Sequence, residues 1–222
     1  RYISFDIETT GVASYDLLAQ AAFLLFEDDK LIREEVFWVD HVTPMLPVHR
    51  QQLEVKLADT RQKIESKPSR FNVKYAVSVE KMQSGVPVER AKASVRSWLD
   101  FSRGERIPML GHNPKFDVRF IQPFIGDLQA FDAIQMIDTD VIERAVQALP
   151  QLRHRDWFEF CKNCSGLGGN KFKSNLSGWC ADKYRWHERQ MVDMNQAHDA
   201  WCDAWLSHLL LQEYKAAAAY GG

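Results

Sequence analysis

The chain of 222 residues is long enough for one domain with a full hydrophobic core, and its four cysteines are too few for a disulfide scaffold. With 45% hydrophobic and 26% charged residues the composition is that of an ordinary globular protein, and no apolar run approaches the length of a membrane span. No signal-peptide pattern is present, so we expect no membrane partner and an intracellular, cytoplasmic location, with a nuclear one left open.

The net charge of −2 does not by itself indicate a nucleic-acid-binding protein, whose usual mark is a basic patch. The distribution of charge is more informative. Residues 1–40 are acidic, whereas 50–74 and 153–189 each carry more Lys and Arg than Asp and Glu. An acidic centre that holds cations, flanked by basic segments that contact phosphates, would produce this pattern. A solvated surface of mixed charge would produce it too.

Residues 2–8 alternate between apolar and polar side chains, which predicts a β-strand. Because successive strand residues point to opposite faces, Phe5 and Ile7 would share one face, and Asp6 and Glu8 the other. The two carboxylates would then point in the same direction. The solvated face of an edge strand would also explain two acids at this spacing.

Two further strands follow, joined by a polar turn at 27–30. Residues 18–26 are almost continuously apolar, which is typical of a central strand covered on both faces. Residues 31–39 supply the third strand and complete an antiparallel meander. Residues 41–86 are less regular, and within them only 51–66 has the composition of a charged helix.

The rest of the chain alternates strands with helices. Apolar spacing and helix-start residues predict strands at 107–111 and 133–137, and helices at 87–101, from 113 onward, and at 139–148, 156–163, 175–187 and 199–214. A meander followed by alternating strands and helices predicts an α/β fold, with helices on both faces of a mixed sheet.

Two local patterns concern helix starts and nearby acids. Asn113-Pro114 predicts that Asn113 caps a helix and Pro114 takes its first position, which places Asp117 in about the first turn. Asp138 and Asp140 follow the end of a strand and imitate catalytic carboxylates. We interpret both as structural or capping residues.

The spacing of His198 and Asp203 limits where their helix can begin. Five residues of an ideal helix turn through about 140°, so the two side chains cannot face one point from within a helix. They converge only if His198 precedes the helix and Asp203 lies one turn inside it. Asp199 is a suitable cap for that boundary.

Four fragments spread over the chain resemble motifs of the DnaQ-like 3′→5′ exonucleases of the histidine (DEDDh) class. They are Phe5–Gly11, Gly111–Asp117, Ile137–Asp140 and Ala197–Asp203. The resemblance implies a ribonuclease H-like fold, with an antiparallel meander and then parallel strands in one mixed sheet flanked by helices. It also implies a single exonuclease domain over 1–215, with a less family-like segment at about 41–86 and a disordered or tag-like tail at 216–222.

The resemblance assigns the catalytic residues as Asp6, Glu8, Asp117, His198 and Asp203. The four acids would hold two Mg²⁺ ions, for which Mn²⁺ can substitute, because these ions prefer carboxylate oxygens and water. Asp6 would bridge both ions, Glu8 and Asp203 would complete the first site, and Asp117 would support the second. His198 would act as the general base. A sister class has tyrosine four residues before the last aspartate, where this chain has aspartate.

The resemblance also places the 3′-terminal nucleotide on the turn after the first strand. Thr9, Thr10, Gly11 and Val12 would bind it, through backbone N–H groups and an apolar contact with the last base. Gly11 would let the substrate approach the backbone closely. Asn113 would contact the nucleotide as well, or serve only as a helix cap.

The implied activity is hydrolysis of phosphodiester bonds at single-stranded DNA or RNA 3′ ends, with release of nucleoside 5′-monophosphates and DNA somewhat preferred. A polymerase or another replication protein is an expected partner. Two alternatives stay open. One is a non-catalytic ribonuclease H-like module that binds nucleic acid or a polymerase, and the other is an RNA-trimming exoribonuclease of the same family.

Overall fold

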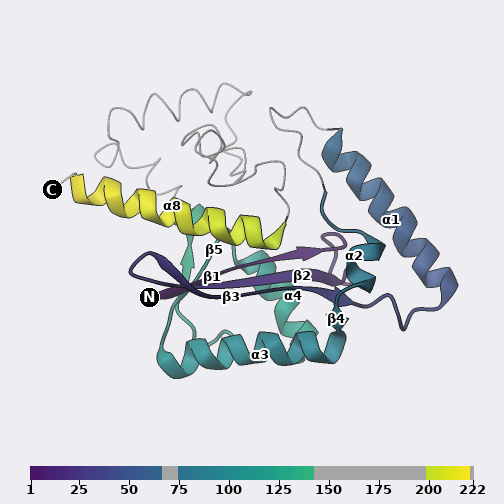
Figure 1. Ribbon diagram of the computed structural model, residues 1–222, viewed down its shortest axis with the longest axis horizontal. Coiled ribbons are helices and arrows are strands. Elements are labelled where there is room, and N and C mark those ends of the chain that lie inside the picture. The colour runs from purple at the N-terminus through teal and green to yellow at the C-terminus, as the bar shows by residue number, and fades with distance from the viewer. Residues whose placement is uncertain (67–74, 143–198, 221–222) are drawn as a thin grey trace.

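The computed structural model describes residues 1–66, 75–142 and 199–220 and contains a mixed sheet of six strands in the order β4-β3-β2-β1-β5-β6 (Figure 1). The strands are β1 Tyr2–Thr9, β2 Leu18–Glu27, β3 Lys30–Asp40, β4 Val86–Pro87, β5 Met109–Gly111 and β6 Met136–Asp138. The first three pair antiparallel, while β5 pairs parallel with both β1 and β6, and β4 pairs parallel with β3. The predicted succession of a meander and then parallel strands is confirmed.

Strands β1 and β2 lie in the middle of the sheet, with a helix layer on each side (Figure 1). Every residue of β2 except Glu27 is buried, which confirms that this apolar strand is covered on both faces. A central position for β1 also removes the interpretation of its two acids as the solvated face of an edge strand.

Helices α3 (Val88–Glu105) and α4 (Lys115–Ile125) cover one face of the sheet. Phe5 of β1 stacks on Phe23 of β2 at 6.2 Å, and Phe23 stacks on Trp98 of α3 at 5.6 Å. Each of these fully buried side chains contributes about 1.5–3 kcal/mol by leaving water. The apolar face of β1 is therefore anchored in the larger core.

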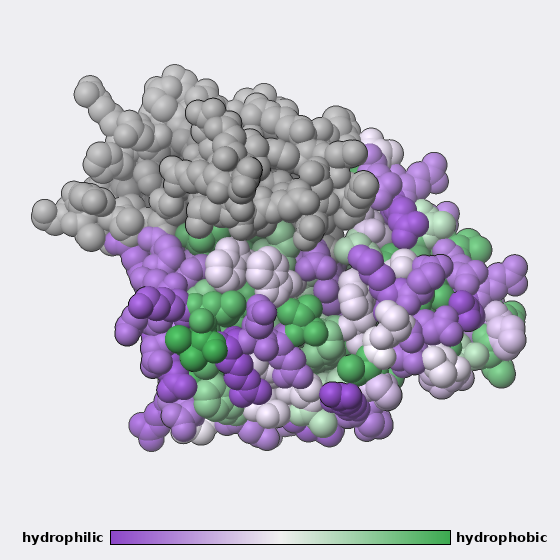
Figure 2. All heavy atoms as spheres, viewed as in Figure 1, coloured by the Kyte–Doolittle hydropathy of each residue, from purple (hydrophilic) through white to green (hydrophobic). Residues whose placement is uncertain are grey.

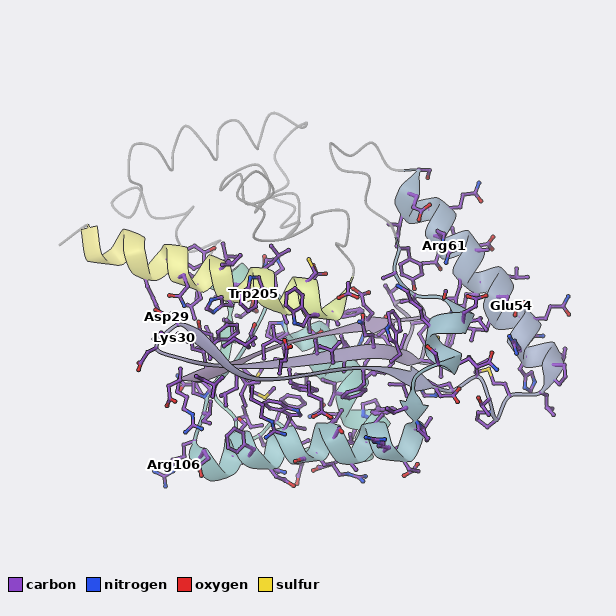
Figure 3. All side chains as sticks on the ribbon, in the orientation of Figure 1. Asp29, Lys30, Glu54, Arg61, Arg106 and Trp205 are labelled. Carbon is purple, nitrogen blue, oxygen red and sulfur yellow. The ribbon has the colours of Figure 1, made fainter. Side chains whose placement is uncertain are left out.

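Helix α8 (Ala200–Tyr220) lies along the opposite face, over β1 and β2 (Figure 1). The Ser4 hydroxyl donates to the carbonyl of Ala204 at 2.6 Å. Trp205 packs against Phe26 on the side of α8 that faces the sheet (Figure 3). The polar face of β1 therefore lies under this helix. Helix α8 extends to Tyr220, past the end predicted near residue 214 and through most of the expected tail.

The segment 41–86 contains more regular structure than its sequence indicated. It forms α1 (Pro47–Glu65), α2 (Val79–Gln83) and the short β4. Helix α1 begins earlier than predicted because Pro47 starts it without needing a hydrogen bond from its nitrogen. Only Leu53 and Leu57 of α1 are buried, so this helix lacks the apolar stripe by which α3 was recognised.

One helix start differs from the prediction. Helix α4 begins at Lys115, after Pro114, and Asn113 has φ of 55°, in the left-handed region that asparagine tolerates better than most residues. Asn113 is therefore not the cap. Its N–H donates to Asp138 at 3.0 Å, and the same carboxylate oxygen accepts from the N–H of Asp140 at 2.9 Å. The capping role predicted for Asp138 is confirmed.

The face shown in Figure 2 mixes hydrophilic and hydrophobic residues over the described part of the molecule. Among the described residues, none of the helices combines the length and the apolar character needed to span a membrane.

Candidate active site

Three carboxylates meet on the α8 side of the sheet. Asp6 and Glu8 come from β1, two residues apart, and Asp203 comes from the first turn of α8. One oxygen from each lies within 4.8 Å of the others, close enough for one cation to contact all three. We call these three residues the acid cluster. The sequence predicted the shared direction of the two strand acids, and the packing of α8 brings in the third.

Asp117 lies beside the acid cluster. It occupies the first turn of α4, as predicted, and is buried. Its Oδ1 accepts a hydrogen bond of 3.1 Å from the N–H of Ile7, the residue between the two strand acids. The backbone of β1 therefore holds Asp117 next to the cluster, while its second oxygen is not used by this bond.

Burial and crowding change the acidity of these groups. Burial, followed by the nearby charges of Asp117 and Asp203, raises the pKa of Asp6 well above its usual value. Burial and then Asp203 do the same to the pKa of Glu8. Burial raises the pKa of Asp117 to about 8. A bound cation would offset both effects, because it compensates the lost hydration and the mutual repulsion of the carboxylates.

The donor set fits a hard divalent ion. All three members of the acid cluster offer carboxylate oxygens, which are the ligands that Mg²⁺ and Mn²⁺ prefer. Imidazole and thiolate donors, which favour softer ions, are absent from this group of described residues.

The start of α8 is held to the sheet by a residue that the sequence reasoning missed. Gln20 lies on β2 directly opposite Glu8. Its side-chain nitrogen donates to Asp199 Oδ2 and its oxygen accepts from the N–H of Ala200, each at 3.0 Å. The signal available in the sequence is a single amide in an otherwise apolar central strand, since a buried amide needs partners.

Asp199 also caps α8, as predicted. Its Oδ1 accepts from the N–H of Trp201 at 3.2 Å and from that of Cys202 at 3.4 Å. The helix therefore begins at Ala200, and Asp203 is one turn inside it. His198, the predicted general base, lies outside the described residues.

The turn after β1 is tightly built. The Thr9 hydroxyl donates to the carbonyl of Gly11 at 2.5 Å, and the Thr10 N–H donates to the carbonyl of Leu17 at 2.9 Å. The Thr10 hydroxyl in turn accepts from the N–H of Leu17 at 3.0 Å. Thr10 is buried and holds the turn, whereas Val12 is 75% exposed.

Gly11 has no room for a side chain. A Cβ atom added there would lie 2.4 Å from Oδ2 of Asp16. The structure therefore shows a close approach by an aspartate of the same chain, and the approach of substrate expected at Gly11 stays a prediction.

A cleft of about 350 Å³ joins these groups. Of the predicted site residues, the cleft is lined by Asp6, Glu8, Thr9, Gly11, Val12, Asn113, Asp117 and Asp203. Thr60 and Ile64 of α1, together with Tyr75, line it as well. The Tyr75 hydroxyl donates to the carbonyl of Thr9 at 2.8 Å. The irregular segment 41–86 therefore supplies part of this wall, and no local pattern in its sequence indicated that.

His112 also lines the cleft. Its Nδ1 lies 2.9 Å from the hydroxyl of Thr139, the residue after Asp138 at the end of β6. His112 therefore packs beside the ends of β5 and β6.

Comparison of the sequence with known protein families finds no match, and no curated protein matches it in sequence. Solved structures do match the fold. The crystal structure of E. coli exonuclease I in complex with a dT13 oligonucleotide has a TM-score of 0.64 at 16% identity, over 99% of this chain and 42% of that chain. The zinc-bound form of the E. coli exonuclease I complex with single-stranded DNA has a TM-score of 0.66 at 15% identity, over 99% of this chain and 41% of that chain. A structure of SSB/exonuclease I with the inhibitor CFAM has a TM-score of 0.62 at 16% identity, over 97% and 41%.

At these identities the likeness shows a common fold. It confirms the mixed sheet with flanking helices that the four sequence fragments implied, since E. coli exonuclease I has the same fold. The chain spans less than half the length of these exonuclease I chains.

Proposed function

We propose that this chain is a metal-dependent 3′→5′ exonuclease that removes nucleoside 5′-monophosphates from single-stranded DNA ends. One observation carries the proposal. Asp6 and Glu8 on a strand meet Asp203, nearly two hundred residues later, within the reach of one cation. Such a convergence of like charges, one of them buried and two partly buried, is costly without a cation, so it is typical of a functional site.

The structural neighbours support the substrate class. They include E. coli exonuclease I in complex with dT13 and dA16 oligonucleotides, and with single-stranded DNA in both zinc-bound and metal-free forms. We propose that single-stranded DNA is also the preferred substrate of this chain and that RNA is a weaker substrate. An SSB/exonuclease I structure is also among the neighbours, but the comparisons give no support for a polymerase partner.

The four acids divide into two proposed ion sites. Asp6, Glu8 and Asp203 would hold the first divalent ion, and Asp117, together with Asp6, would hold the second. Two such ions, when bound, supply an activated nucleophile and positive charge for the leaving oxygen. The contribution of the chain is to hold four carboxylates from β1, α4 and α8 in place before the ions arrive.

The role of general base is assigned to His198, which immediately precedes Asp199, the cap of α8. We propose that it takes a proton from the attacking water as the phosphodiester bond is hydrolysed. Its position in sequence, just ahead of the helix that carries Asp203, supports this role.

The 3′-terminal nucleotide is assigned to the turn after β1. Thr9, Gly11 and Val12 line the cleft beside the acids, and Asn113 lines it from the start of α4. We propose that Thr10 acts one step behind them by holding the turn in shape. The exonuclease unit would comprise residues 1–215, with 41–86 contributing to the cleft.

A substrate panel tests the proposal. Single-stranded DNA, duplex DNA and RNA of equal sequence, each labelled at the 5′ end, are incubated with the chain and Mg²⁺ or Mn²⁺. We expect a ladder that shortens from the 3′ end, fastest on single-stranded DNA and abolished by chelation. Asp203→Asn should abolish it, whereas Asp132→Asn, at an exposed acid outside the cleft, should leave it unchanged.

Two results would reject the proposal. Activity that is unchanged in Asp203→Asn would show that the acid cluster is not the catalytic centre. Binding of the labelled strands without any cleavage would favour the non-catalytic binding module instead. Cleavage of RNA but not of DNA would show that RNA is the substrate, while the proposed metal-dependent hydrolysis would still hold.

A further inference from the structure

The cleft lies along one face of α1. Thr60 and Ile64, four residues apart, both line it, and Lys56 lies one turn before Thr60 on the same face. The Thr60 hydroxyl donates to the carbonyl of Lys56 at 2.9 Å. The ammonium group of Lys56 lies over the ring of Tyr15, 5.3 Å from its centroid. Tyr15 is not one of the residues that line the cleft, but through Lys56 it lies about one helical turn beyond Thr60.

The loop that carries Tyr15, residues 10–17 between β1 and β2, is held by contacts with two helices. On one side Lys56 of α1 makes an ion pair with the buried carboxylate of Asp16, which also accepts from the N–H of Ala13 at 2.8 Å. On the other side the guanidinium of Arg119, from α4, donates to the carbonyl of Val12 at 2.8 Å. These contacts hold the backbone of the loop from both flanking helices.

Two apolar side chains nevertheless remain in solvent on this fastened loop. Val12 is 75% exposed and lines the cleft, and Tyr15 is 81% exposed. Lys56 occupies one face of the Tyr15 ring, so the exposed area includes the other face. A single exposed tyrosine needs no explanation in general. This ring differs because it lies beside the Lys56 ammonium group, on the same short loop as Val12, which lines the cleft.

We propose that Tyr15 is a stacking platform for the base of a nucleotide upstream of the 3′-terminal one, on single-stranded DNA that enters the cleft along α1. The proposal rests on the proposed function, since it places the terminal nucleotide at Val12 and the acids. Grooves that bind single strands combine cations with aromatic rings on which successive bases stack. Here Lys56 and Arg119 are the cations next to the loop, and Tyr15 is its aromatic ring.

The test compares two substrates that differ in the upstream base. One is an oligothymidylate with a 5′-fluorescein label, and the other is thymidine 5′-(p-nitrophenyl phosphate), which has a single nucleoside. We expect Tyr15→Ala to raise KM for the oligonucleotide by about 5- to 150-fold, the range for the loss of one base–aromatic contact. The kcat value for the oligonucleotide and the rate on the nitrophenyl ester should stay unchanged.

Two variants serve as controls. Tyr15→Phe keeps the ring and should keep the KM of the natural chain. Leu128→Ala removes an apolar side chain that is 73% exposed and does not line the cleft, and should change neither substrate. The stacking role of Tyr15 would be wrong if Tyr15→Ala left KM for the oligonucleotide unchanged. It would also be wrong if Tyr15→Ala lowered the activity on the oligonucleotide and on the nitrophenyl ester equally.

Anisotropy of the labelled oligonucleotide, measured with Asp203→Asn and with Asp203→Asn/Tyr15→Ala, separates this proposal from the function on which it rests. If affinity depends on Tyr15 while the natural chain cleaves nothing, the exonuclease function fails and the platform stands. If the natural chain cleaves DNA while affinity and KM are unchanged by Tyr15→Ala, the stacking role of Tyr15 is wrong and the exonuclease function stands. Absence of any binding overturns the platform as well.

Discussion

The side chain of Gln20 donates to Asp199 at 3.0 Å, and this contact joins the centre of the sheet to the residue that caps α8. The same side chain accepts from the N–H of Ala200, also at 3.0 Å. Gln20 lies opposite Glu8 in the β1–β2 ladder. It therefore connects the start of α8 to the position on the sheet next to the strand that carries Asp6 and Glu8. We infer that this link helps to set the distance between Glu8 and Asp203.

Replacement of Gln20 by leucine should therefore weaken metal binding as well as folding. It leaves the buried N–H of Ala200 without its acceptor, which costs about 1–3 kcal/mol of unfolding free energy. We expect Mn²⁺ affinity, measured by titration calorimetry, to fall along with the melting temperature. Ser102→Ala is the control, because it removes a buried hydrogen bond to Ile107 outside the cleft. It should lower the melting temperature and leave Mn²⁺ affinity unchanged, and an equal fall in Mn²⁺ affinity in both variants would contradict the positioning role of Gln20.

The roles proposed for His198 and Asp203 separate by metal titration. A positioned general base contributes about 10²- to 10⁴-fold to rate, so His198→Ala should lose that much in kcat and retain Mn²⁺ affinity. Asp203→Asn should lose both turnover and affinity, because it removes a carboxylate from the acid cluster. Nearly full activity of His198→Ala at neutral pH would show that the histidine is not the base.

The pKa shifts predict how stability depends on pH in the absence of metal. Asp117 has a pKa of about 8 when folded, against an ordinary value of 3.8, and the shifts of Asp6 and Glu8 have the same direction. Between these two pH values the folded chain binds more protons than the unfolded chain, so the free energy of unfolding falls as pH rises. The contribution is complete below pH 3.8 and is lost as pH passes about 8.

Melting curves measured with a chelator and with Mn²⁺ test whether stability falls as pH rises. We expect the chelated chain to melt at a lower temperature at pH 8 than at pH 6, and Mn²⁺ to raise the melting temperature more at pH 8, where it competes with fewer protons. Asp117→Asn should reduce the pH dependence in chelator. A stability that rises from pH 6 to pH 8 in the chelated chain, and that still rises in Asp117→Asn, would contradict the assignment.

Gly11 and Gly104 form a matched pair for substitution by alanine. In Gly11→Ala the new Cβ would meet the carboxylate of Asp16 and push it away from Lys56 and Ala13. We expect this variant to lose about 1–3 kcal/mol of stability through its broken buried contacts. Gly104 lies within α3 and has open space, so Gly104→Ala should gain about 0.5–1 kcal/mol. Chemical denaturation measures both, and equal effects would show that Gly11 is not constrained by Asp16.

The state of the 3′ end tests the placement of the terminal nucleotide on Thr9, Gly11 and Val12. A 3′-phosphate adds bulk and negative charge next to the buried acids, so it should block digestion of an oligonucleotide that is degraded with a free 3′-hydroxyl. The measurement is the initial rate on two oligonucleotides that differ only in this group. Equal rates would point to endonuclease chemistry.

Local rules in the sequence were sufficient for several parts of the site. The period of a strand placed Asp6 and Glu8 on one face, and both are found there. Helix geometry and capping chemistry placed Asp199 at the start of α8 and Asp203 one turn inside it, as the structure shows. These predictions succeed because each depends on residues within one turn or one strand. Asn113 shows the limit, since its backbone is left-handed and its N–H contacts Asp138 on a neighbouring strand, which its own local sequence did not indicate.

The family resemblance led us to expect that the distant acids meet, but only the tertiary structure shows which contacts bring them together. The 4.8 Å spacing of the acid cluster requires that α8 cross the sheet where it does, and the contacts of Gln20 are among those that hold α8 there. The cleft wall supplied by Thr60, Ile64 and Tyr75 has no period or motif in the sequence. Such contacts arise when separate elements bury their surfaces together, so their partners are fixed by packing across the chain and not by neighbours along it.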